Sequence, residues 1–320
     1  MILEEIILFL LIQKNLTFMR NIPIYLLLFF HFSTSAQTYK EDKKLKAKIL
    51  ELTAGFKGDV GVYVHNLKTN KVVEINADSI FPTASMVKIP IMVGVFDKIQ
   101  QGKLKYTDEI MYRDSLHYDD GIVGSLKDSA KIPLNNVVML METVSDNTGS
   151  LWMQALAGGG KSINDLMEKY GFVHTRVNSR TSNRQQNQKI YGWGQTSPRE
   201  IATLLTMIRQ GKIISSDASD RMYRNLGRQA WDGEGLSQLP ENVRVMSKNG
   251  AVNKSRSEVV LVHAPHAEYV YAVITKNQKD ERWERNNEGY ELLRKVASLL
   301  WNYYEPKSNW KPVEGYEKWW

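Results

Sequence analysis

The chain has 320 residues, of which 42% are apolar, 10% aromatic and 24% charged, a composition that fits a folded globular protein and is too apolar for disorder. It contains no cysteine, which excludes disulfides, thiolate metal ligands, a cysteine nucleophile and a lipid-modified cysteine. The net charge is +7, but Lys and Arg are scattered among acidic residues, so we expect no nucleic-acid partner.

The N-terminus has the pattern of an export signal. From Met19 the chain has a positive start, an apolar stretch from Ile22 to Phe32 and small residues up to Ala36. We therefore expect residues 1–36 to be a signal peptide, with Met19 as the start of translation, and the mature protein to be periplasmic or secreted. The alternative is an uncleaved anchor, but no apolar run here reaches the roughly 18 to 20 residues that a membrane span needs.

Strand patterns lie at both ends of the remaining chain and helical patterns lie between them. Alternating and turn residues predict strands over 59–65, 71–75, 243–247, 259–264 and 269–275. Apolar periodicity predicts helices over 39–53, 85–100, 134–144, 151–157, 162–170, 198–209 and 287–304. The helix from Ser85 to Gln100 is apolar at most positions, so it should be buried on most sides. A long polar loop, Val177 to Thr196, has no predicted element.

This order predicts an α+β fold in which an antiparallel sheet, built from the N- and C-terminal segments and flanked by helices, carries an inserted all-helical lobe. We expect one domain over residues 37–320. Its α/β part would span about residues 40–82 and 215–305, and its helical lobe about residues 83–214.

The first of three motifs is Ser85-Met86-Val87-Lys88. On a helix, residues three apart share a face, so the amine of Lys88 could take the hydroxyl proton of Ser85 and make it a nucleophile. Lys88 must be neutral part of the time to do so, and burial with nearby cations would lower its pKa. A Ser-x-x-Lys tetrapeptide alone also occurs by chance.

The second motif, Ser145-Asp146-Asn147, follows a predicted helix. Its serine could relay a proton to a leaving nitrogen, and its asparagine could hold a substrate carbonyl or orient Lys88. The same tripeptide could instead be only a capping turn at a helix end.

The third motif, Lys248-Asn249-Gly250, follows a predicted strand. Its ammonium could hold a substrate carboxylate, and its glycine would let the strand backbone approach a ligand closely. The alternative is an ordinary Asn-Gly hairpin turn.

In this order and on these elements, the three motifs resemble those of the class A β-lactamases and the penicillin-binding serine acyl enzymes. Ile89-Pro90, Thr148 and Thr196-Ser197-Pro198 match as well. The resemblance covers about Lys44 to Tyr304.

The resemblance implies a role for each motif side chain. Ser85 would be the nucleophile, Lys88 its base, Ser145 a proton shuttle, Asn147 an orienter of substrate and lysine, and Lys248 an electrostatic clamp. The substrate would be a small-molecule β-lactam or a cell-wall peptide, hydrolysed through an acyl-enzyme. We expect no cofactor, no metal and a monomer.

The other expected substrate contacts lie on and after the third motif. The backbone N–H groups of Ser85 and Ala251 would form the oxyanion hole, with Gly250 allowing the close approach. Asn249 replaces the family's usual threonine or serine and could still donate to a carboxylate. Arg256 is either a second carboxylate contact or a surface charge of the hairpin.

One family feature is missing. Class A β-lactamases release the acyl group with a water activated by a loop glutamate, but residues 171–199 contain neither Asp nor Glu. Glu168 and Glu200 flank this loop without fitting the family position, so we expect slow deacylation. Three loop side chains could position or activate water instead, although aromatic packing that anchors the loop is the favoured interpretation of the last: Asn178, Gln186 and Tyr191.

Two other functions stay open at this stage. The chain could be a penicillin-binding D-alanyl peptidase or another cell-wall peptide hydrolase. It could also be a non-catalytic receptor for cell-wall fragments or β-lactams, although the presence of both Ser85 and Lys88 argues against this.

Overall fold

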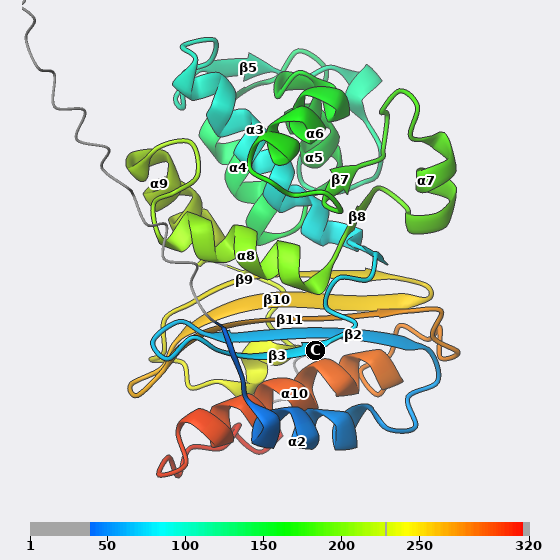
Figure 1. Ribbon diagram of the computed structural model, residues 1–320. Coiled ribbons are helices and arrows are strands. Elements are labelled where there is room, and N and C mark those ends of the chain that lie inside the picture. The colour runs from blue at the N-terminus through cyan, green and yellow to red at the C-terminus, as the bar shows by residue number, and fades with distance from the viewer. Residues whose placement is uncertain (1–38, 228, 316–320) are drawn as a thin grey trace, which may run out of the picture. The chain divides into compact units, whose positions relative to one another are not determined.

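The computed structural model describes residues 39–227 and 229–315 (Figure 1). The predicted export signal over residues 1–36 lies outside them. Within the described residues, no helix has both the length and the apolar character needed to cross a membrane.

The centre of the fold is a six-stranded sheet made from both ends of the chain. Its strand order is β1 (Lys40–Glu41), β3 (Lys71–Ile75), β2 (Asp59–Asn66), β11 (Glu268–Lys276), β10 (Ser255–His263) and β9 (Val245–Val252). All neighbours are antiparallel except the two-residue β1, which pairs in parallel with β3. The predicted α+β fold is confirmed, with β1 as a short parallel addition.

Each face of the sheet packs against different helices. Helices α2 (Lys43–Thr53) and α10 (Glu288–Tyr304) cover one face, and α8 (Pro198–Arg209) lies on the other (Figure 1). Because side chains alternate along a strand, Val260 and Val262 of β10 join the α10 core, whereas Val259 and Leu261 join the core shared with α8.

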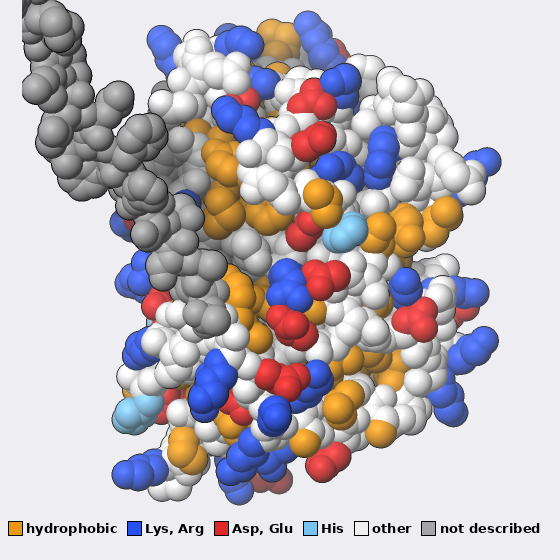
Figure 2. Space-filling view, viewed as in Figure 1, with side chains coloured by type: hydrophobic (Ala, Val, Ile, Leu, Met, Phe, Trp, Pro, Cys, Tyr) orange, Lys and Arg blue, Asp and Glu red, His pale blue; other side chains and the backbone are white. Residues whose placement is uncertain are grey.

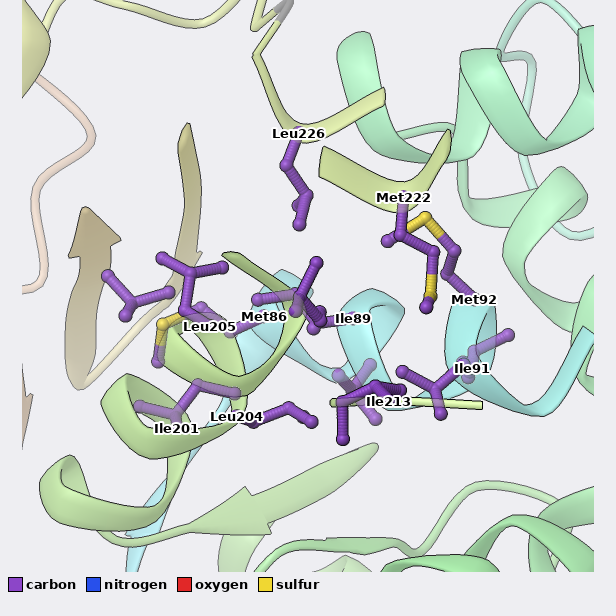
Figure 3. Packing of buried hydrophobic residues seen from close by; sticks show 14 of the residues in the cluster. Met86, Ile89, Ile91, Met92, Ile201, Leu204, Leu205, Ile213, Met222 and Leu226 are labelled. Atoms are coloured by element: carbon purple, nitrogen blue, oxygen red, sulfur yellow. The ribbon is translucent and has the colours of Figure 1, made fainter. Parts of the chain in front are cut away.

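The helical lobe is built around one buried helix. Its elements are the 3₁₀ turn η2 (Ala84–Val87) and the helices α3 (Lys88–Gln100), α4 (Leu134–Thr143), α5 (Asn147–Leu156), α6 (Gly159–Lys169) and α9 (Ser216–Leu226). Every residue of α3 from Lys88 to Phe96 is buried, as the apolar pattern predicted. Figure 3 shows Ile89 and Met92 of this region in one buried apolar cluster with Leu204 of α8 and Met222 of α9.

Short elements complete the fold. They are β4 (Phe81–Pro82), β5 (Glu109–Met111), η3 (Asp114–Leu116), β6 (Lys131–Pro133), β7 (Arg176–Val177), α7 (Gln185–Tyr191), β8 (Gly194–Thr196) and η4 (Gly235–Gln238). The predicted loop over 177–196 therefore contains α7 and β8, and β8 pairs with β4 just before Ser85. The sequence pattern had also missed α9.

Charged side chains of both signs are interspersed on the face shown in Figure 2, as their scatter along the sequence indicates. One group of ion pairs links α8 to the sheet side of the molecule. Arg199 lies 2.6 Å from Glu74 and 2.7 Å from Asp78, and its guanidinium stacks over the ring of Tyr63.

We expect the α10 core to contribute strongly to stability. Leu300 is fully buried between α10 and the sheet, so Leu300→Ala should lower the free energy of unfolding by about 2–5 kcal/mol through lost contacts and a residual cavity. Urea unfolding measures the change. Leu50→Ala on α2 is the matched control: Leu50 is 45% exposed, and its truncation should change stability by less than about 1 kcal/mol. Equal losses in both variants would contradict this assignment of the core.

Candidate active site

Lys88 joins the first two motifs. Its Nζ lies 2.8 Å from Ser85 Oγ, 3.0 Å from Ser145 Oγ and 2.8 Å from Asn147 Oδ1, and 2.9 Å from the carbonyl oxygen of Ser145. Lys88 is fully buried, whereas Ser85, Ser145 and Asn147 are partly exposed. A reactant at the surface could therefore reach the hydroxyl of Ser85, while the amine behind it is shielded from water.

The backbone on both sides of this cluster is strained. Ala84, directly before the candidate nucleophile, has φ 45°, and Ser145 has φ 61°. Non-glycine residues rarely adopt this left-handed region, and holding one there costs about 1–3 kcal/mol. The surrounding structure holds both residues there: Ala84 directly precedes Ser85, and Ser145 itself contacts Lys88.

Asp146 fixes the second motif in place. As N-cap of α5, its carboxylate accepts hydrogen bonds from Gly149 N at 2.7 Å and from Val123 N at 2.9 Å. The tripeptide is therefore a helix cap and also a wall of the Lys88 cluster, so the two interpretations of this motif are compatible.

The third motif lies inside β9 rather than after it. Strand β9 runs to Val252, which pairs with Ser255, so the hairpin turn falls beyond the motif and the Asn-Gly turn alternative is wrong. Gly250 lies against the nucleophile: a Cβ at this position would stand 2.7 Å from Ser85 N and equally close to Thr83 O. Only glycine allows this approach.

Lys248 and Gly250 share the face of β9 that looks toward Ser85, since strand side chains alternate. Lys248 is fully buried, with its Nζ 3.3 Å from the carbonyl of Asn249. Asn249 and the following Ala251 are partly exposed at the edge of the sheet. The structure thus brings the third motif beside the first.

Burial and charge act together on Lys88. Burial lowers the pKa of Lys88 to about 7, and the positive charge of Lys248 contributes to the same shift. A lysine with this pKa is neutral in part near neutral pH, as a proton acceptor for Ser85 must be. Both causes were expected from the sequence.

Two acidic residues in the cluster escaped the sequence analysis. Asp119 accepts a hydrogen bond from Asn147 Nδ2 at 2.6 Å, which turns the amide so that its oxygen faces Lys88. Glu142 of α4 is fully buried, and neither of its carboxylate oxygens has a hydrogen-bond partner among the described residues. Glu142 occupies an inward position of an apolar helix, where a carboxylate is rare, and this was the available signal.

Trp231 closes the site between the second and third motifs. Its Nε1 donates to Val144 O at 2.8 Å, and its carbonyl accepts from Asn249 Nδ2 at 3.2 Å. The side chain is 55% exposed, so it forms part of the rim that an entering molecule would contact.

Arg256 does not join the cluster. Gly250 pairs with Ser257 across the β9–β10 ladder, so Ser257 faces the site and Arg256 points to the opposite face of the sheet. There its guanidinium is stacked between Trp283 and Tyr290, with ring centroids at 4.7 and 4.5 Å. This placement gives no support to a carboxylate contact by Arg256, and it also excludes a surface charge, because Arg256 is fully buried.

Glu200 lies outside the Lys88 cluster and binds the start of the loop that follows α6. The carboxylate of Glu200 accepts hydrogen bonds from the backbone N–H groups of Val173, His174 and Thr175 at 2.6–3.0 Å, and from Thr175 Oγ1 at 2.7 Å. Its role in this structure is to fix the start of the loop.

The three candidate water-positioning side chains lie within the same loop. Asn178 is fully buried and bonded to Arg184 and Gly192, so its amide is used to hold the loop together. Gln186 is exposed on α7, and Tyr191 is partly exposed at its end. No hydrogen bond joins any of them to the Ser85 cluster among the described residues.

Comparison with known proteins agrees with this geometry. Residues 44–304 match the model of the β-lactamase enzyme family. The chain belongs to this family. β-Lactamase VEB-1 of Pseudomonas aeruginosa is 21% identical over 88% of this chain and 97% of its own length. β-Lactamase SME-1 of Serratia marcescens is 23% identical over 68% of this chain and 74% of its own.

Among solved structures, a point mutant of PBP-A, described as an acyl-enzyme complex with penicillin G, superposes with a TM-score of 0.74. It is 25% identical, and the match covers 83% of this chain and 98% of PBP-A. The fold is therefore that of β-lactamases and penicillin-binding proteins, and the chain is a hydrolase of the β-lactamase type. Within residues 39–227 and 229–315, no group of three His, Asp or Glu side chains could hold a metal ion.

The anchoring role of Glu200 predicts a stability effect. Glu200→Gln replaces one acceptor oxygen by an amide that donates, which leaves N–H groups at the start of the loop without their acceptor, and should lower the free energy of unfolding by about 1–3 kcal/mol. Urea unfolding measures it. Glu168→Gln is the control, because Glu168 is exposed on α6 and should change stability little. A Glu200 variant as stable as the wild type would refute the role.

Proposed function

We propose that this family member is a serine hydrolase that β-lactams acylate at Ser85 and that releases the acyl group slowly. One observation carries the proposal: the buried amine of Lys88 lies 2.8 Å from Ser85 Oγ, in surroundings that lower the pKa of Lys88 to about 7. A serine hydroxyl becomes a useful nucleophile only when such a base can accept its proton.

The acylation step follows from the positions of these groups. Neutral Lys88 takes the proton of Ser85 as Oγ bonds to the lactam carbonyl carbon, and the N–H groups of Ser85 and Ala251 stabilise the resulting oxyanion. The lactam C–N bond then breaks, and a proton from the Lys88 ammonium passes through Ser145 Oγ to the leaving nitrogen. Lys248 binds the substrate carboxylate.

Deacylation is the step for which the site is poorly equipped. The loop over 171–199 offers no carboxylate, and Glu200 is committed to its backbone hydrogen bonds. General-base activation of water typically contributes about 10²- to 10⁴-fold. We therefore expect an acyl-enzyme that outlives its formation by a wide margin.

The lack of a loop carboxylate is also compatible with a second function, that of a D-alanyl peptidase or a related hydrolase of cell-wall peptides. The likeness to PBP-A is compatible with it. Complete β-lactam turnover within seconds would speak against the peptidase, whereas an adduct lasting for minutes is the expected outcome for both functions. For either activity we propose export to the periplasm or the medium after removal of residues 1–36, and a monomeric mature protein.

Ser85→Ala should abolish covalent labelling by a β-lactam such as penicillin G, because it removes the hydroxyl that forms the ester. Intact-protein mass spectrometry after a short pulse measures the adduct. Ser79→Ala is the matched control, an exposed serine a few residues upstream that should label like the wild type.

The same pulse followed in time reports the release of the adduct. Labelling of the Ser85→Ala variant would refute the assignment of the nucleophile. A wild-type adduct that disappears as fast as it forms would refute slow deacylation.

The pKa of Lys88 predicts the pH dependence of acylation. Only neutral Lys88 accepts the proton, so the acylation rate should fall about tenfold per pH unit below pH 7. The rate should fall again on the alkaline side, where Lys248, with its pKa lowered by burial to about 8, loses the charge that binds the substrate carboxylate. Rapid-quench mass spectrometry from about pH 5 to about pH 9 measures both limbs.

Lys98→Met supplies the comparison for the pH profile. Lys98 lies on the same helix, α3, but binds Asp97 and Ser162 rather than the cluster, so this variant should keep the wild-type limb. A wild-type rate that is independent of pH over the whole range would show that Lys88 is not the base.

A further inference from the structure

Glu142 is a buried carboxyl group that the acylation mechanism does not use. It lies on α4, three residues before Ser145, and has no exposed surface. Neither carboxylate oxygen has a hydrogen-bond partner among the described residues. Burying an unpaired carboxylate is costly, and an apolar side chain would fill this position without that cost.

The charges that act on Glu142 are those of Lys248 and Lys88. In return, Glu142 is the strongest attractive charge on each of the two lysines. Burial raises the pKa of Glu142 and lowers that of Lys248, while the attraction between the two opposes both shifts. Glu142 is the buried acidic residue of α4, which packs against α3, the helix of Lys88, and its charge acts on both lysines.

The other carboxylates near the lysines are already committed. Asp146 accepts from two backbone N–H groups, and Asp119 accepts from Asn147. Glu258, which acts on Lys248, accepts from Gly235 N. Each of these has a structural hydrogen bond, whereas Glu142 has none among the described residues, so electrostatic action on the lysines is the function left to it.

We propose that Glu142 is a positioning residue whose negative charge keeps Lys248 an ammonium under conditions in which Lys88 is already neutral. This inference rests on the proposed acylation of Ser85. With Glu142 ionised, Lys248 charged and Lys88 neutral, the three buried groups sum to zero charge. That state has both the base for Ser85 and the clamp for a substrate carboxylate.

Among the described residues, the elements packed around α4 bring no further buried positive charge to this arrangement. From α3 comes Lys88, and from the α5 side comes Asp146, which acts on Lys88. The inward residues of α9 are uncharged, and Lys131 of β6 is exposed and paired with Glu109. In the segment before β9, burial raises the pKa of Asp232, which favours its neutral form.

The test is the pH profile of acylation in Glu142→Gln, an isosteric variant without the charge. Removing the carboxylate lowers the pKa of both lysines, so both limbs of the profile should move to lower pH. Acylation should become faster on the acid side, where Lys88 limits the rate, and slower on the alkaline side, where Lys248 loses its proton. The rate on each limb should change about tenfold for every pH unit by which that limb moves.

Glu305→Gln is the matched control. Glu305, at the end of α10, is also buried, and it forms an ion pair with His266. Its substitution therefore tests the loss of a buried carboxyl group that is remote from the site. This variant should keep the wild-type profile. Glu142→Asp retains the charge and should move the limbs less than Glu142→Gln. A Glu142→Gln profile that superposes on the wild type overturns the inference.

Titration of the free protein separates this inference from the proposed function. In chains labelled with ¹³C at lysine and glutamate side chains, Glu142→Gln should lower the pH at which Lys88 and Lys248 titrate, whether or not Ser85 is acylated. If wild-type Ser85 forms no adduct but the lysines shift, only the proposed function fails. If Glu142→Gln does not fold, the wild-type Glu142 signal decides: a carboxyl that stays protonated from about pH 5 to about pH 9 overturns the inference.

Discussion

The buried amine of Lys88 is the contact on which the site depends. Its four hydrogen-bond partners come from η2, from the turn after α4 and from the first residue of α5, so one nitrogen fixes the relative positions of three elements. The left-handed backbone at Ala84 and Ser145 is maintained around this nitrogen. An amine in this position must lose its proton easily, which is the property that a base for Ser85 requires.

Burial of Lys88 close to a second lysine creates charge repulsion that other groups of the site must offset. A second buried lysine, Lys248, lies close enough to lower the pKa of the first, and two buried ammonium groups without compensation would destabilise the fold. The negative charge of Glu142 offsets this repulsion. The chemistry and the stability of the helical lobe are therefore linked through the charge state of three buried groups.

The sheet brings the third motif against the candidate nucleophile. Gly250 lets β9 pass against the backbone of Ser85, and Ser257 of the neighbouring strand lies within hydrogen-bonding distance of both Thr83 O and Gly250 O. The loop after α6 is tied to the segment before Ser85 through the pairing of β8 with β4. The carboxylate that follows this loop, Glu200, is occupied by hydrogen bonds from backbone N–H groups, which is the basis of the slow deacylation that we propose.

Local features follow from the amino-acid sequence alone. The strands at both ends and the buried helix predicted over 85–100 follow from periodicities of two and 3.6 residues, which depend only on near neighbours in the chain. The other features depend on tertiary packing, which placed Ser85 on a 3₁₀ turn and began the α-helix at Lys88. Strand register turned Arg256 away from the site, and the packing of α4 made Glu142 a partner of two lysines distant in sequence. Such contacts depend on which face of an element meets which neighbour, and local pattern does not contain that information.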